Sequence, residues 1–257
     1  SVADTSDAPP NVRASVLQAM GRSVAGTAGD DEKQELLSRL SEEMAAAQSS
    51  PAERTLLKRF GDCLAALKSF PLVQQACIRK VLATIVEGQL WDITYFQHNP
   101  TVQSDADTEL YTYRVAGCVG EFWTELGYAA MGEKFCDPQQ QELMTLAGIR
   151  YGRGLQLINI LRDREEDLQR GRSYLCSEPA KWLNRADYYM NDGIDYCRRL
   201  RGFRLRFASM LPALIGKKTI ALLRRARPED GRVKIPRRAV YACMLKAVWL
   251  SLVARAS

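Results

Sequence analysis

Apolar residues recur every three or four positions in successive segments of the chain, which places them on one face of an α-helix. Breaks separate the predicted helices: Pro9 and Pro10, the Gly/Thr/Ala/Gly stretch at 26–29, Pro51 and Pro71. No run of alternating β-branched residues indicates a β-strand. The sequence therefore predicts an all-α fold, a helical bundle whose facing helices bring polar groups to its centre.

Residues 155–174, LQLINILRDREEDLQRGRSY, carry a polar line inside an apolar helical pattern. Gln156, Asn159, Asp163 and Asp167 follow one another at helical spacing, so they share one face of the predicted helix. Buried amides need hydrogen-bond partners, and two carboxylates one turn apart repel unless a proton or a cation lies between them. The alternative is that these residues form a solvent-exposed acidic surface without a binding role. The polar line continues into an apolar run, and this favours a binding site over such a surface.

Residues 108–123, TELYTYRVAGCVGEFW, predict a second unusual helix because Gly117 and Gly120 lie inside it. Each glycine costs about 1 kcal/mol relative to alanine within a helix. Their spacing leaves one face without side chains, so either another helix or a ligand comes unusually close there. Asp92, beside Trp91 in a further apolar segment, is another polar residue that the core pattern does not explain.

The amino-acid composition limits the classes of binding partner and of active-site chemistry that the protein can have. The 257 residues, 46% of them hydrophobic, suffice for one large domain or at most two. A formal charge of +6 favours anionic partners such as nucleic acid, phospholipid head groups or phosphorylated metabolites. Seven scattered cysteines without a CxxC pair indicate reduced thiols. His98 is the single histidine, which excludes most histidine-based metal sites and nucleophile schemes.

Targeting signals are not evident in the sequence. Nothing at the N-terminus resembles a signal peptide, and no apolar run reaches the ~18 residues of a spanning helix. We therefore expect a cytoplasmic protein. Residues 237–253, RRAVYACMLKAVWLSLV, are apolar enough for core or for contact with a membrane surface, so peripheral membrane contact is an additional expectation.

The acidic residues suggest a chemistry for the polar face. Magnesium takes one or two protein carboxylates while substrate phosphates complete its shell, and Asp4 with Asp7 offers a second acidic pair near the N-terminus. Three arginines stand beside Asp163 and Asp167, where they can bind the same phosphate oxygens: Arg162, Arg170 and Arg172. Metal and arginine would stabilise a leaving diphosphate. An allylic carbocation left behind requires a dry cavity lined by apolar and aromatic groups.

These motifs resemble those of the squalene/phytoene synthase family. NILRDREEDLQRGRSYL resembles the family's second acidic motif, YTYRVAGCVG its tyrosine plus V-A-G-x-V-G helix, and EGQLWD its G-M-x-x-D segment. The resemblance implies a single isoprenoid-synthase domain over residues 1–257, a helical bundle with a central cavity. It also implies dependence on Mg²⁺, with Mn²⁺ as a substitute, and head-to-head condensation of two prenyl diphosphates through a cyclopropyl intermediate.

The resemblance also implies roles for individual residues. Asp163 and Asp167 would bind magnesium with support from Glu166, and Arg162 and Arg172 would grip the diphosphate. Tyr111 would handle a proton near the leaving group. The implied substrate-binding residues are Gln156, Asn159, Val115, Ala116, Val119, Gly120, Tyr174 and Asp92.

The first acidic motif departs from the family pattern D-x-x-x-D. Asp7 follows Asp4 at a spacing shorter by one, and Ser1 stands where the family has an arginine. The helix that precedes this motif in the family is absent from the sequence, so we expect a domain without its N-terminal helix. Asp4-Thr5 resembles squalene-forming members more than phytoene-forming ones. Asp4 and Asp7 are nevertheless predicted metal ligands.

The leading hypothesis is a squalene synthase that converts two farnesyl diphosphates into presqualene diphosphate and then, with NADPH, into squalene. The alternatives are a phytoene- or dehydrosqualene-type synthase and a catalytically inactive relative that acts as an assembly factor. The sequence has no NADPH fingerprint, so the reductive step rests on the resemblance. Nucleic-acid binding rests only on the +6 charge, and we expect no such partner.

Overall fold

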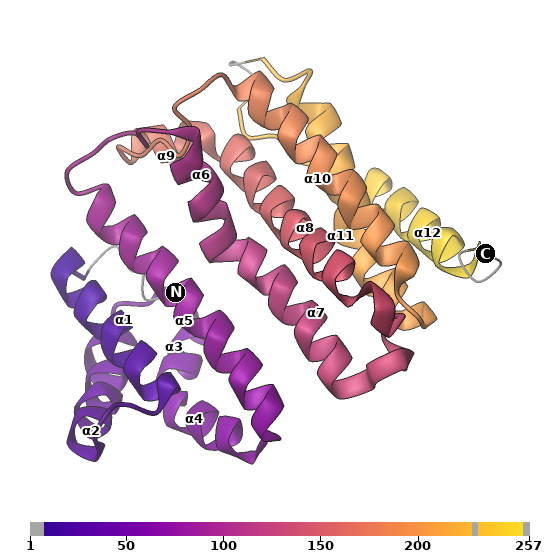
Figure 1. Ribbon diagram of the computed structural model, residues 1–257. Coiled ribbons are helices and arrows are strands. Elements are labelled where there is room, and N and C mark those ends of the chain that lie inside the picture. Colours follow the sequence, from indigo (N-terminus) through magenta and orange to yellow (C-terminus); the bar gives the residue numbers. More distant parts are fainter. Residues whose placement is uncertain (1–7, 228–230, 254–257) are drawn as a thin grey trace. The chain divides into compact units, whose positions relative to one another are not determined.

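The computed structural model describes residues 8–227 and 231–253, and within these ranges its regular structure is helical. The only β-type pairing among these residues is an isolated bridge between Thr101 and Ser173. The prediction of an all-α fold is therefore confirmed. Contacts divide the chain into two compact units, Ser1–Asn99 and Pro100–Ser257, whose helices are labelled in Figure 1.

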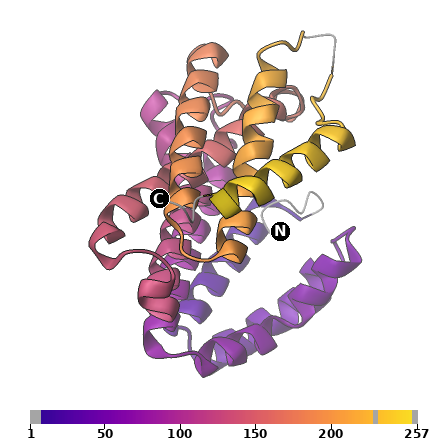
Figure 2. The same ribbon diagram turned by 90° about the vertical axis from the view of Figure 1, so that its right-hand side faces the viewer.

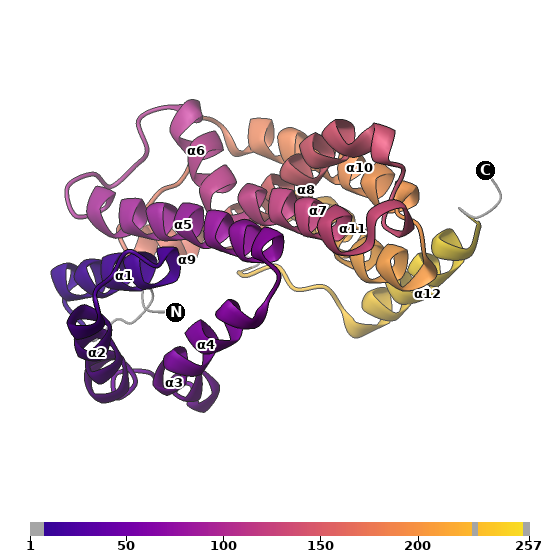
Figure 3. The ribbon, with the colours of Figure 1, turned by 60° about the horizontal axis from the view of Figure 1, so that its bottom comes forward.

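The first unit is built on the packing of its first helix along its last, as Figure 3 shows for α1 and α5. Its core includes Val16, Leu17, Leu40 and Met44, all nearly inaccessible to solvent. Helices α1, α3 and α5 begin at or directly after the prolines that the sequence marks as breaks. Proline fits the first turn of a helix but interrupts a helix that precedes it. The bounds of the unit's helices are α1 Pro10–Ala25, α2 Asp30–Arg39, α3 Pro51–Lys58, α4 Phe60–Ser69 and α5 Leu72–Tyr95, with a π-helical turn at Leu40–Met44.

The second unit is arranged around α8, which lies between α7 and α10 in Figure 1 and also packs against α11. Figure 2 shows the last helix, α12, lying obliquely against α11. The bounds are α6 Asp105–Thr112, α7 Cys118–Met131, α8 Gln141–Arg162, α9 Arg164–Gln169, α10 Pro179–Arg199, α11 Phe203–Leu223 and α12 Arg237–Val253. A π-helical turn, Tyr113–Gly117, joins α6 to α7.

Glycines allow α7 and α8 to approach until their backbones touch. A Cβ atom added at Gly120 would overlap the carbonyl group of Gly148, and one added at Gly152 would overlap the carbonyl group of Ala116. The glycine-stripped face of residues 108–123 is therefore used for close packing against another helix. This packing fixes α8 beside the π-helical turn.

Two contacts attach the chain after α9 to the start of α6. The Thr108 hydroxyl donates to the Tyr174 carbonyl oxygen at 2.7 Å, and the Val102 amide donates to the Ser173 carbonyl oxygen at 3.0 Å. A capping box between Ser104 and Asp107 starts α6. The C-terminal end of the acidic stretch is thereby held against α6, the helix that carries Tyr111.

Candidate active site

The polar line of residues 155–174 continues across a break between two helices. Helix α8 ends at Arg162, Asp163 adopts φ −99° and ψ 8°, and α9 begins at the next residue. The Asp163 amide still donates to the Asn159 carbonyl oxygen at 2.9 Å, and the Asp167 amide to the Asp163 carbonyl oxygen at 3.0 Å. Because these four-residue hydrogen bonds continue across the break, the polar side chains remain on one side.

These side chains line a hollow of about 290 Å³, called the acidic hollow below. It includes Tyr111 from α6 and Tyr174 from the segment after α9, besides groups from α8 and α9. Eight residues that the sequence analysis singled out meet there: Tyr111, Gln156, Asn159, Asp163, Glu166, Asp167, Arg170 and Tyr174. Arg232 completes the polar lining.

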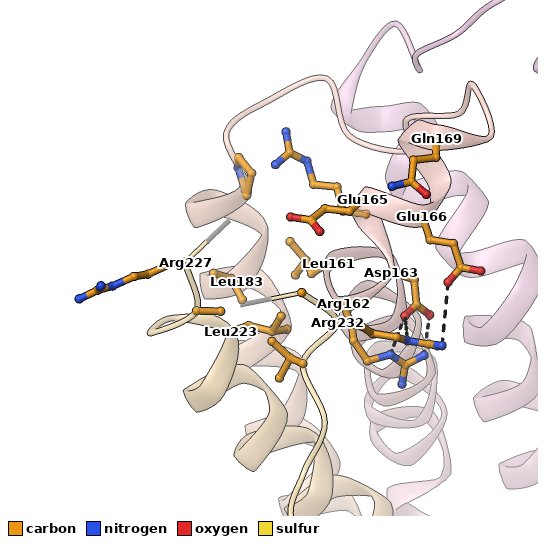
Figure 4. A pocket seen from close by; sticks show the side chains of 15 residues that line it. Leu161, Arg162, Asp163, Glu165, Glu166, Gln169, Leu183, Leu223, Arg227 and Arg232 are labelled. Atoms are coloured by element: carbon orange, nitrogen blue, oxygen red, sulfur yellow. Dashed lines mark hydrogen bonds and ion pairs between the residues drawn. The ribbon is translucent and has the colours of Figure 1, made fainter. Parts of the chain in front are cut away.

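Arginines pair with the carboxylates of the acidic hollow. Arg162 donates to both carboxylate oxygens of Asp163, from Nε at 2.8 Å and from Nη2 at 2.6 Å. Arg232 places its Nε 2.8 Å from Asp163 Oδ1 and its Nη1 3.9 Å from Glu166 Oε2 (Figure 4). The Arg162 hydrogen bonds, assisted by Arg232, hold the pKa of the Asp163 carboxyl below its ordinary value although partial burial opposes this shift.

The donor set of the acidic hollow fits magnesium that is shared with a substrate. Asp163, Glu166 and Asp167 supply carboxylate oxygens, the ligands of hard divalent cations. Among residues 8–227 and 231–253, no three acidic, cysteine or histidine side chains gather closely enough to enclose a metal ion. Magnesium normally takes one or two carboxylates and completes its shell with phosphate oxygens and water, so such a partial set is sufficient. The predicted ligands Asp4 and Asp7 lie outside the described residues.

Two stacked tyrosines form part of the wall of the acidic hollow. The rings of Tyr111 and Tyr174 stack with centroids 4.7 Å apart and planes inclined by 20°. Both residues are buried, with 9% and 8% of their surface exposed. This stacking holds the Tyr111 ring in one orientation beside the acidic residues.

A second hollow, of about 380 Å³, lies along α7 and α8 and is called the apolar hollow below. No charged side chain lines it among the residues that the structure describes. Its two buried phenols point their hydroxyls at neutral partners: Tyr151 donates to the Ser209 carbonyl oxygen at 2.7 Å, and Tyr196 pairs with the Thr124 hydroxyl at 2.9 Å. Burial raises the pKa of both phenols, so they stay neutral. The lining includes the predicted Val115, Ala116, Val119 and Gly120, with Trp123, Gly148, Tyr151, Gly152, Leu155, Tyr196, Ala208, Ser209 and Pro212.

The acidic and apolar hollows are neighbours along α8. Leu155 lines the apolar hollow, and the next residue, Gln156, lines the acidic hollow. A single helix thus presents a charged binding surface at its C-terminal end and an apolar one further back. This arrangement suits an amphiphilic ligand with a hydrocarbon chain and an anionic head that a bound cation bridges to the carboxylates.

Some predicted residues do not join these hollows. Arg172 lines neither, although its backbone amide donates to the Asp167 carbonyl oxygen at 2.9 Å. Arg162 faces a third hollow of about 480 Å³, drawn in Figure 4, which shares Asp163, Glu166 and Arg232 with the acidic hollow. Asp92 is buried in α5, which belongs to the other unit.

Arg232 is the residue of the acidic hollow that the sequence analysis missed, as it missed Tyr151 and Tyr196 of the apolar hollow. Arg232 lies in a stretch that reads as a turn between two helices, about 70 positions beyond Asp163. The only local signal is its charge, and the surrounding sequence contains many arginines. The pairing with Asp163 depends on how the end of α11 is placed against α9.

Comparison with known proteins identifies the family. The family model described as squalene/phytoene synthase matches residues 8–187, which include α8, α9 and the tyrosine of α6. The chain belongs to the squalene/phytoene synthase family.

Relatives in sequence are named as phytoene synthases. A 15-cis-phytoene synthase of Synechocystis sp. is 32% identical over 143 residues, covering 54% of this chain and 40% of the relative. A bifunctional lycopene cyclase/phytoene synthase of Pyrenophora tritici-repentis is 31% identical over 131 residues, covering 48% of this chain and 22% of the relative. The matched part thus spans less than half of each relative.

The fold is similar to that of a squalene-synthase-like solved structure. A ligand complex of TcSQS aligns over 98% of this chain and 83% of that chain, with a TM-score of 0.63 and 19% sequence identity. At this identity the match shows the all-α fold alone.

Proposed function

We propose that the chain is a magnesium-dependent prenyltransferase that condenses two prenyl diphosphates head to head. The observation that carries the proposal is the position of the acidic hollow, with three carboxylates, next to an uncharged apolar hollow on the same helix. A prenyl diphosphate fits this arrangement when Mg²⁺ bridges its phosphate oxygens to the carboxylates and its hydrocarbon chain enters the apolar hollow. Membership of the squalene/phytoene synthase family supports this reaction class.

The binding roles follow from the chemistry of each side chain. Asp163 and Asp167, with support from Glu166, would hold Mg²⁺, or Mn²⁺ in its place. A bound Mg²⁺ supplies positive charge that stabilises the departing diphosphate. The amides of Gln156 and Asn159 line the same hollow and orient the diphosphate and its water. Arg162, together with Arg172 by family resemblance, would add bidentate contacts to phosphate oxygens.

The reacting carbon atoms would lie in the apolar hollow. Val115, Ala116, Val119 and Gly120 exclude water there, and the faces of Tyr151 and Tyr196 tolerate a carbocation. Tyr111 lines the acidic hollow beside the leaving group, where its hydroxyl would transfer a proton. The roles of Asp4, Asp7 and Asp92, and a single domain over residues 1–257, remain proposals from the family resemblance.

The product is proposed from two observations that point in different directions. The Asp4-Thr5 pair resembles squalene-forming members, which favours presqualene diphosphate and, with NADPH, squalene. The relatives in sequence are named as phytoene synthases, which favours a phytoene- or dehydrosqualene-type product without NADPH. We place the squalene-type reaction first because its motif lies in this chain itself.

Product analysis tests the proposal directly. The protein is incubated with labelled farnesyl or geranylgeranyl diphosphate and Mg²⁺, with and without NADPH, and the products are separated. We expect consumption of a prenyl diphosphate, abolished in Asp163→Asn but retained in Asp195→Asn, a matched change at an exposed carboxylate on α10. If neither diphosphate is consumed, the prenyltransferase proposal is wrong. Full biological effect from an inactive Asp163→Ala variant would instead support an assembly factor.

Contact with a membrane surface is also proposed, through α12. None of the described helices has an apolar stretch long enough to cross a bilayer. Helix α12 nevertheless exposes Tyr241, Leu245 and Trp249, each by at least 60%, and begins with Arg237 and Arg238. Apolar and basic groups together favour an anionic lipid surface. Co-sedimentation with anionic vesicles, reduced in Leu245→Asp, would support this contact, and equal sedimentation would exclude α12 from it.

A further inference from the structure

Arg232 is held on the acidic hollow by residues distant in sequence. It lies between α11 and α12, and its guanidinium pairs with Asp163 at 2.8 Å and approaches Glu166 at 3.9 Å. The Arg232 side chain is 49% exposed, whereas that of Asp163 is 22% exposed. The arginine is thus the more accessible member of the pair.

The Asp163 carboxylate has little accepting capacity left for a further cation. Its Oδ1 atom accepts from Arg162 Nε and pairs with Arg232 Nε, both at 2.8 Å, and its Oδ2 atom accepts from Arg162 Nη2. A carboxylate oxygen has two lone-pair sites, so Oδ1 is saturated. Departure of Arg232 would free one lone-pair site of Oδ1 for magnesium, which lies about 2.1 Å from its ligands, and would remove one of the two guanidinium charges that repel the ion.

Arg232 is the guanidinium that can leave. Arg162 is the sequence neighbour of Asp163 and holds it by two hydrogen bonds, so it stays close whatever else binds. Arg232 makes one short contact and one long contact, at the end of an exposed side chain. Exposed pairs of this kind contribute little stability, so a divalent cation can displace this one.

We propose that Arg232 and a divalent cation compete for Asp163 and Glu166, and that metal binding releases the Arg232 guanidinium to the phosphate oxygens of the substrate. The inference rests on the proposed metal site of the acidic hollow. Arg232 lines that hollow, so the freed guanidinium is already beside the diphosphate. Metal and diphosphate binding then become coupled through this residue, beyond their direct contact with each other.

A titration with Mn²⁺ alone tests the competition. Free Mn²⁺ is followed by electron paramagnetic resonance in the wild type, Arg232→Gln, Arg232→Lys and Arg198→Gln. Arg198→Gln is the control, because it removes the same charge far from the site. The first turn of α10 lines the third hollow, and Arg198 lies in the last turn, roughly 28 Å further along the helix. We expect Arg232→Gln to bind Mn²⁺ about twofold to fivefold more tightly, the range for losing an exposed ion pair. Arg198→Gln should match the wild type.

The lysine variant separates a specific contact from general charge. It keeps the positive charge but loses the planar fork that fits a carboxylate, so its Mn²⁺ affinity should fall between the wild type and Arg232→Gln. Mn²⁺ should also accelerate amide hydrogen exchange at Val233 in the wild type and not in Arg232→Gln. A residue with only a structural role would produce neither effect.

Inorganic diphosphate supplies a second readout with the opposite sign. In the presence of saturating Mn²⁺, Arg232→Gln should bind diphosphate about twofold to fivefold more weakly, because the freed guanidinium is missing. Tighter Mn²⁺ binding together with weaker diphosphate binding supports the inference. If the wild type binds Mn²⁺ and Arg232→Gln binds it equally well or less tightly, the inference is wrong while the metal site stands. Equal Mn²⁺ binding by the wild type and Asp163→Asn would overturn both.

Discussion

Arg162 grips the carboxylate of its own sequence neighbour, Asp163, with hydrogen bonds of 2.8 and 2.6 Å to its two oxygens. Adjacent residues in a continuous helix point about 100° apart, so they do not face each other. The break at Asp163, with φ −99° and ψ 8°, allows this contact. The predicted metal ligand is thus oriented by local structure.

The Arg162 contact predicts a pH dependence of stability. The pKa of Asp163 is lowered on folding, so its contribution is present above the unfolded pKa of about 3.9 and is lost as the pH falls through the lower folded value. Urea unfolding without metal should show the wild type gaining stability over Asp163→Asn as the pH rises from about 3 to about 6. In an Arg162→Gln background this gain should shrink, because Arg162 is the largest cause of the shift. A gain independent of pH would contradict the prediction.

Tyr111→Phe should separate stacking from proton transfer. The phenyl ring retains the stack on Tyr174, so the free energy of unfolding should change by about 1 kcal/mol or less. Loss of the hydroxyl should lower kcat by about 100-fold, the lower end for removing a general acid or base. Steady-state rates of prenyl diphosphate consumption measure this. Tyr188→Phe, at a half-exposed tyrosine of α10, is the control and should keep its rate. A wild-type rate in Tyr111→Phe would remove the proposed role.

Gly120→Ala should destabilise the second unit. The added methyl group would overlap the Gly148 carbonyl group, and backbone atoms cannot move aside as a flexible side chain can. We expect a loss of about 1–3 kcal/mol in urea unfolding. Gly61→Ala in α4 is the matched control, since its methyl group would lie 3.5 Å from a Leu37 methyl group. It should raise stability by up to about 1 kcal/mol through helix propensity. Equal effects of the two changes would argue against backbone contact between α7 and α8.

Arg206→Met should loosen α12 from α11. Arg206 is 8% exposed, and it donates from Nε to the Leu200 carbonyl oxygen at 2.5 Å and from Nη1 to the Ser251 carbonyl oxygen at 3.2 Å. Methionine fills a similar volume but leaves these carbonyls without their charged donor, at a cost of about 1–3 kcal/mol. Hydrogen exchange across α12 should accelerate. Arg204→Met, on the exposed side of the same helix, should leave the exchange of α12 unchanged.

The helices and the polar line could be predicted from the sequence because both depend on local interactions. Pro51 occupies the first turn of α3, and Pro71 directly precedes α5, since proline restricts the backbone at its own position. The polar line continues through the break because backbone hydrogen bonds four residues apart continue there. Each polar residue therefore lies about one helical turn after the one before it. The residues are Gln156, Asn159, Asp163 and Asp167. The family followed from the same local motifs.

The tertiary structure alone decided which distant residues meet these motifs. The glycine pair left two alternatives open, and the contact of Gly120 with Gly148 shows the close helix packing, while the same glycines also line the apolar hollow. The stack of Tyr111 on Tyr174 and the ion pair of Arg232 with Asp163 likewise join segments far apart in the chain. Such contacts depend on how whole helices pack, and no local spacing encodes that packing. The sequence determined the acidic face, and the fold determined its partners.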